Sequence, residues 1–140
     1  MRYLKSILPA VLLIPLAGVL LASDAQNFDG KWLTTVSCAN YQDALGFSYQ
    51  FVSIVKDGVF HGVHGTVGLA GSLVIDGTIA PDGKASLYAK GRTGSPQYVL
   101  GHDTPKGTEY GYNIDAHFEG STGTGTRVEG RPCAMKFVKK

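Results

Sequence analysis

Hydrophobic and polar residues alternate in short runs through most of residues 28–138, and this pattern predicts β-strands. Successive side chains of a strand point to opposite faces, so a period of two gives one apolar and one polar face. In the clearest run, residues 110–118, the apolar face holds Tyr110, Tyr112, Ile114, Ala116 and Phe118. No segment after residue 25 keeps a helical period over about ten residues, so we expect little or no helix.

Turn-forming residues separate the runs. Asp57-Gly58 and Asp82-Gly83 are typical of tight hairpins, because Asp-Gly tolerates the positive φ angles that such turns require. The pattern predicts about eight strands, at residues 28–38, 46–56, 59–66, 71–79, 84–91, 97–101, 109–118 and 124–138. We expect the last strand to bend at Gly130-Arg131-Pro132, since proline cannot donate to a central ladder. The short connections favour an up-and-down order.

The two cysteines, Cys38 and Cys133, lie in the first and the last predicted strands. In an even-stranded up-and-down barrel these strands are antiparallel neighbours, and their register places the two cysteines side by side. We therefore predict an all-β fold, an antiparallel up-and-down barrel of about eight strands closed by a disulfide. The alternative is a β-sandwich, in which the same bond would join two sheets.

Residues 1–25 have the pattern of a signal peptide. Arg2 and Lys5 precede an apolar run over residues 7–22, and small residues stand before a cleavage site after Ala25. The run is shorter than the roughly 20 residues of a spanning helix, and an uncleaved anchor is the alternative. Export to the periplasm or the cell exterior agrees with a disulfide. We expect a single barrel domain over residues 26–140, with no membrane span in this mature chain.

Charge and motifs exclude several classes of function. The formal net charge is +2 and no basic patch stands out, which argues against nucleic-acid binding. No nucleophile elbow, zinc-protease or phosphate-loop motif is present, so we predict no enzyme, no catalytic residue and no cofactor. Asp115, His117 and Glu119 share a face of one predicted strand and would be the first residues to test in an enzyme. A straight strand separates them too far for a metal site, which we do not predict.

The segment Phe28-Asp29-Gly30-Lys31-Trp32 resembles the Gly-x-Trp opening of the calycins, the group of lipocalins, fatty-acid-binding proteins and avidins. The chain also resembles small exported bacterial proteins of unknown function. The calycin resemblance implies a barrel and a late arginine that packs over the tryptophan, for which Arg127 and Arg131 are the candidates. If Cys38 and Cys133 lie opposite each other in antiparallel strands, the register instead places Trp32 opposite the C-terminal lysines.

The aromatic residues are the main indication of function. Eight have inward parity on their predicted strands: Trp32, Phe47, Tyr49, Phe51, Tyr110, Tyr112, Phe118 and Phe137. An eight-stranded barrel is either filled by such side chains or holds one small ligand, and periodicity does not separate the two. Our first hypothesis is a non-enzymatic barrel that binds a small apolar or amphipathic ligand through Trp32, Tyr49, Phe51, Tyr110 and Tyr112.

Two other functions remain open. The runner-up is a secreted or periplasmic interaction or inhibitor protein, whose partner would contact the predicted loop at residues 93–108, with Tyr98, His102 and Asp103. An outer-membrane barrel is disfavoured, because charged residues such as Lys90 and Glu119 have outward parity.

Overall fold

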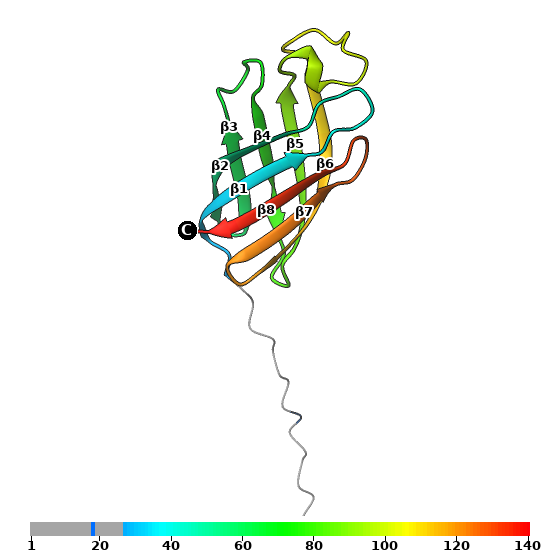
Figure 1. Ribbon diagram of the computed structural model, residues 1–140. Coiled ribbons are helices and arrows are strands. Elements are labelled where there is room, and N and C mark those ends of the chain that lie inside the picture. Colours follow the sequence, from blue (N-terminus) through cyan, green and yellow to red (C-terminus); the bar gives the residue numbers. More distant parts are fainter. Residues whose placement is uncertain (1–17, 19–26) are drawn as a thin grey trace, which may run out of the picture.

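The computed structural model describes Gly18 and residues 27–140; apart from Gly18, the predicted signal peptide lies outside the described residues. Residues 27–140 form a closed antiparallel barrel of eight strands in sequence order (Figure 1). The strands are β1 (Gly30–Cys38), β2 (Phe47–Lys56), β3 (Val59–His64), β4 (Leu73–Ile79), β5 (Lys84–Arg92), β6 (Glu109–Glu119), β7 (Thr122–Arg127) and β8 (Cys133–Lys139). One 3₁₀ turn, η1 (Pro96–Tyr98), is the helical element of this part. The predicted barrel is confirmed, and the sandwich alternative is wrong.

The seam between β1 and β8 closes the barrel. Cys38 lies directly opposite Cys133 in this pair of strands, and the two are joined by a disulfide, as predicted. The bond links residues 95 positions apart, and in the chain-entropy model such a loop contributes about 4.7 kcal/mol to stability. The same register places Trp32 opposite Lys139, as predicted.

Two of the predicted strands are wrong. Residues 97–101 do not form a strand, because Pro96 begins η1 and the segment belongs to a long connection. Residues 124–138 do not form one bent strand, because the chain reverses between β7 and β8. Gly130 has a positive φ of 78° at this reversal, and Pro132 lacks the N–H that would continue a ladder. The total of eight strands agreed because these two errors offset each other.

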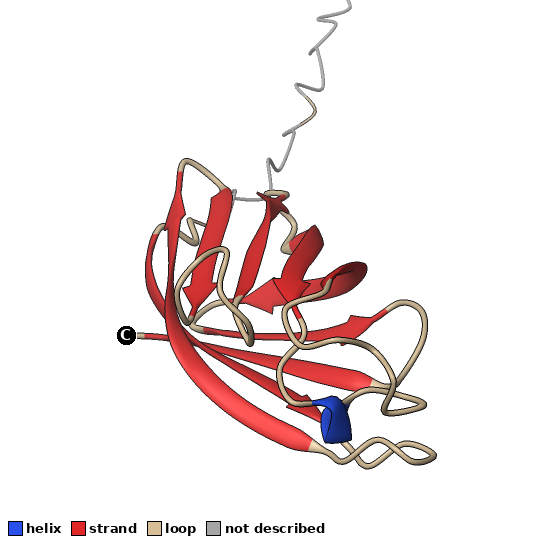
Figure 2. Cartoon of the chain, turned by 90° about the horizontal axis from the view of Figure 1, so that it is seen from above, coloured by secondary structure: helices blue, strands red, loops and turns tan. Residues whose placement is uncertain are grey.

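The two ends of the barrel differ in the length of their connections. At the end where β1 starts, the strands are joined by short turns at residues 57–58, 80–83 and 120–121. At the other end they are joined by longer segments at residues 39–46, 65–72, 93–108 and 128–132. We call these the closed end and the open end. Figure 2 shows η1 among the connections of the open end.

Aromatic side chains fill the interior at the closed end. Trp32, Phe118 and Phe137 are fully buried, and the Trp32 and Phe118 rings meet edge to face with centroids 5.2 Å apart. The Trp32 Nε1–H donates a hydrogen bond of 2.8 Å to the carbonyl of Phe28, whose ring also packs on Phe118. Because rings fill this half of the interior, the inner space that remains lies towards the open end.

Candidate functional site

A cavity of about 270 Å³ lies at the open end of the barrel. The Cys38–Cys133 disulfide forms part of its wall, and the β5–β6 connection contributes Val99 and Leu100. Its larger side chains are those of Phe47, Tyr98, Tyr110, Tyr112, Arg127 and Arg131. The cavity is therefore mainly aromatic and contains two positive charges.

Tyr110 and Tyr112 reach the cavity because β6 extends beyond its partner β7. The pairing of these strands starts at Ile114 opposite Arg127. Both tyrosines therefore lie between this pair and the open end, on the inward face of β6. Their rings stack with centroids 6.2 Å apart and planes 10° from parallel. The Arg127 guanidinium lies 4.3 Å from the centroid of the Tyr112 ring, which is a favourable cation–π distance.

A second aromatic wall lies where β2 and β3 separate. These strands pair only from Ser53 to Lys56 on the β2 side, so the first half of β2 has no partner in β3. The Tyr49 ring stacks on Phe47, 5.7 Å away, and on the His64 imidazole, 3.9 Å away. This row of rings lies beside the part of β2 that pairs with β1 but not with β3, and it borders the cavity, which Phe47 lines.

The three inward tyrosines keep their protons. Burial raises the pKa of Tyr49 well above its usual value of 10.0, and the neighbouring Tyr110 and Tyr112 raise it further. Burial likewise raises the pKa values of Tyr110 and Tyr112, while the charge of Arg127 opposes the shift. None of these hydroxyls has a hydrogen-bond partner among residues 27–140, so each is available to donate to a ligand.

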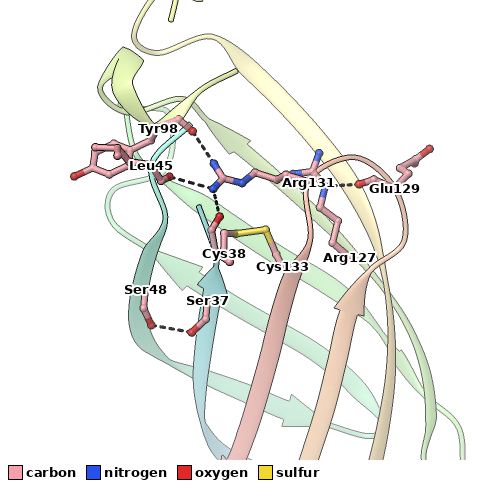
Figure 3. Close-up of a disulfide and its surroundings, with 10 residues drawn as sticks. Ser37, Cys38, Leu45, Ser48, Tyr98, Arg127, Glu129, Arg131 and Cys133 are labelled. Carbon is pink, nitrogen blue, oxygen red and sulfur yellow. Dashed lines mark hydrogen bonds between the residues drawn. A yellow bond between two sulfur atoms is a disulfide. The ribbon is translucent and has the colours of Figure 1, made fainter. Parts of the chain in front are cut away.

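Arg131 connects three segments of the open end. It extends across the disulfide, where Nη1 donates to the carbonyl of Tyr98 at 2.8 Å and Nη2 to those of Ala39 and Leu45 at 2.6 and 3.0 Å (Figure 3). Its Nε–H is buried and has no hydrogen-bond partner in the described part of the chain. Burial lowers the pKa of Arg131, and the nearby charge of Arg127 lowers it further.

The β5–β6 connection, residues 93–108, is held over the mouth of the cavity. The backbone N–H of Gly101 donates to the Asp43 carboxylate at 3.1 Å, and Leu45 N–H donates to Gln97 O at 2.9 Å. On the β5 side, Arg92 donates to the carbonyl of Gly107 at 3.0 Å. This connection, in which we predicted a partner-binding loop, thus also forms part of the cavity lining.

The predicted ligand-binding residues do not all meet at one place. Tyr110 and Tyr112 line the cavity, and Tyr49 and Phe51 lie in the adjoining aromatic wall. Trp32 does not line the cavity, because it is packed at the closed end.

From the sequence, Arg127 and Arg131 were candidates only for packing over Trp32, and neither was expected in the cavity. The cation beside that ring is instead the Lys139 ammonium, 5.9 Å from the ring centroid. The one available signal was the position of Arg131 two residues before Cys133, which the predicted disulfide places at the end of the barrel.

The histidines and acidic residues do not assemble a metal site. Asp115, His117 and Glu119 are exposed on the outer face of β6, and no three His, Cys, Asp or Glu side chains of the described residues converge on a metal position. His61 pairs with Asp76 on the outer wall, whereas His64 turns inwards to Tyr49.

Across the described residues we find no helix long and apolar enough to cross a membrane. Comparison with protein-family models, with curated proteins and with solved structures found no match for this chain.

Proposed function

We propose that the protein is an exported, non-enzymatic barrel that binds a small apolar or amphipathic ligand at its open end. The observation that supports this is the aromatic-walled cavity of about 270 Å³ above a fully packed closed end. Ligand sites are typically concave, mostly apolar and of roughly 300–1,000 Å³, with a few polar groups that orient the ligand. The cavity lies just below this range, so we expect a ligand smaller than a typical drug molecule.

Several residues suit this role. The rings of Phe47, Tyr98 and Tyr110 offer apolar surface, and the unpaired hydroxyls of Tyr110 and Tyr112 offer orienting donors. The disulfide supports export, since such bonds persist in oxidising compartments. The signal-peptide pattern of residues 1–25 supports it independently.

Titration with the neutral fluorophore N-phenyl-1-naphthylamine tests the proposal. We expect saturable binding at one site per chain. Tyr112→Leu should weaken binding by about two- to tenfold, because an aromatic contact contributes about 0.5–1.5 kcal/mol. The matched control is Tyr88→Leu, which removes an exposed tyrosine from the outer face of the neighbouring strand β5 and should leave the affinity unchanged.

Native mass spectrometry of the protein purified from its own compartment gives a second measurement. We expect a fraction of the molecules to carry a small-molecule mass. A wholly ligand-free mass, together with no saturable fluorophore binding, would contradict the proposal.

A protein-interaction role is the second candidate. Within the β5–β6 connection, Tyr98 and Leu100 are 36% and 38% exposed, and bonds to Asp43 hold the connection in place. An ordered surface of this kind suits a protein partner. This function replaces the first if the exported protein carries no small molecule but co-purifies with a partner protein in a fixed ratio. The variant Lys106→Glu, which reverses a charge in the β5–β6 connection, should then abolish the co-purification.

A further inference from the structure

The cavity contains two positive charges that no acidic side chain neutralises. Arg127 and Arg131 both line it, and both come from the segment around the β7–β8 connection (Figure 3). The ion pairs of the described residues are His61–Asp76, Arg92–Glu109 and His102–Asp43, and none of them includes either arginine. Arg131 is buried, so water screens its charge less than it would at an open surface.

Several hydrogen-bond donors of these residues are free. Arg127 Nε donates to the carbonyl of Glu129 at 2.6 Å, but its two Nη atoms have no hydrogen-bond partner among residues 27–140. Arg131 uses both Nη atoms on carbonyls, whereas its Nε–H is buried and unpaired. A buried donor costs free energy until an acceptor reaches it, so this site favours a ligand that brings acceptors.

We propose that the ligand carries a carboxylate-type anionic head group, held by Arg127 and Arg131 while its apolar body lies against Tyr110, Tyr112 and Phe47. An ionised carboxylate has acceptors only, and its two oxygens match the donor fork of a guanidinium. Its charge would also relieve the repulsion between the arginines. The proposal rests on the proposed function and specifies the ligand class for the same cavity.

Arg131 clamps the open end together, and this structural role explains the presence of Arg131 but not that of Arg127. Its bonds to Ala39, Leu45 and Tyr98 hold the open end together whether or not a ligand is present. Arg127 makes no such link between segments, since its one hydrogen bond stays within the β7–β8 connection. Arg127 is therefore the residue to change, because its loss leaves the clamp in place.

Ligands that share the same ten-carbon chain but differ in their head group test the proposal. Decanoate, decan-1-ol and decyltrimethylammonium would each displace N-phenyl-1-naphthylamine from the wild-type protein. We expect decanoate to bind at least about tenfold more tightly than decan-1-ol, as a hydrogen bond to a charged group outweighs a neutral one. Decyltrimethylammonium should bind most weakly, because two positive charges repel its head group.

Two variants separate the specific contact from general charge. Arg127→Gln should lower the ratio of the decanoate to the decan-1-ol affinity to about one, with the larger change in the affinity for decanoate. Lys90→Gln removes a positive charge from the exposed face of β5 and should change neither affinity. The Arg131 Nε–H resonance of the wild-type protein should shift with decanoate and not with decan-1-ol, which reports on Arg131 without altering the clamp.

The outcomes distinguish this inference from the proposed function. Equal affinities for decanoate and decan-1-ol, or an unchanged ratio in Arg127→Gln, would overturn the anionic head group and leave a binding barrel. If the wild-type protein binds neither N-phenyl-1-naphthylamine nor any of the three ligands, both proposals fail.

Discussion

His64 lies at the position where β2 and β3 separate, and its surroundings disfavour a charge. The imidazole stacks on Tyr49 and also lies near the Phe51 ring, with centroids 5.9 Å apart. Burial among these rings lowers the pKa of His64 from its usual 6.5. The folded protein therefore binds a proton at this residue less readily than the unfolded chain does.

This difference predicts a pH-dependent loss of stability. Above about pH 6.5 neither state is protonated at His64, and as the pH falls below this value the unfolded chain takes up the proton first. The free energy of unfolding of the wild type should then decrease relative to that of His64→Phe, which keeps a ring on Tyr49 but cannot titrate. Urea unfolding of both proteins between about pH 8 and pH 5 measures the difference. A difference that stays constant over this range would contradict the prediction.

At single residues, the alternation of the sequence predicted the inward positions well. Tyr112, Phe118 and Phe137 are buried as expected, because the face of a strand on which a side chain lies depends only on local parity. Arg127 has the same inward parity as Gly123 and Gly125, but its meeting with Arg131 in a cavity was not predictable from parity. The cavity depends on where the β5–β6 and β7–β8 connections, distant in the sequence, return to the barrel.

The inner face of β7 carries no apolar side chain. Gly123, Gly125 and Arg127 have the inward parity and threonines point outwards, so the element has no apolar face. The Phe118 ring occupies the space that a side chain at Gly123 would need, since a Cβ there would lie 2.9 Å from Phe118 Cδ1. The missing apolar face also explains why β7 was not recognised as a separate strand in residues 124–138.

Adding a side chain at this position should destabilise the protein. Valine is a better strand former than glycine, but its side chain would press on the ring of Phe118, which is fully buried. We expect Gly123→Val to lower the free energy of unfolding by about 1–3 kcal/mol through overpacking. Thr124→Val, one residue further and exposed, is the control and should stay within about 0.5 kcal/mol. Equal unfolding midpoints in urea for the two variants would show that the core adapts to the extra side chain.

For the whole molecule, the packed core and the cavity lie towards different ends of the barrel. The closed end holds the packed rings around Trp32, and the open end holds the cavity. The pairing of consecutive strands was predictable from the up-and-down order, and the closure between β1 and β8 was predictable from the two cysteines. Whether the interior is filled or hollow was not predictable, because it depends on how side chains from all strands combine.

This separation predicts the effect of changing Trp32. Trp32→Phe removes the hydrogen bond to Phe28 O and leaves unfilled volume, so we expect a loss of about 2–3 kcal/mol in the free energy of unfolding. The affinity for N-phenyl-1-naphthylamine should stay within roughly twofold, because distant sites act nearly independently. Denaturation and fluorophore titration of the same variant measure both quantities. Loss of binding in a variant that remains folded would instead place Trp32 in the ligand site.

Both ends of the described chain leave the barrel beside the closed end. The first strand starts there, and the backbone N–H of Lys140 donates to the carbonyl of Lys31 at 2.9 Å. A carrier protein or a solid support attached through either terminus would therefore hold the mouth of the cavity away from the point of attachment. The barrel thus has the arrangement that an immobilised receptor needs, because the points of attachment and the mouth of the cavity lie at opposite ends.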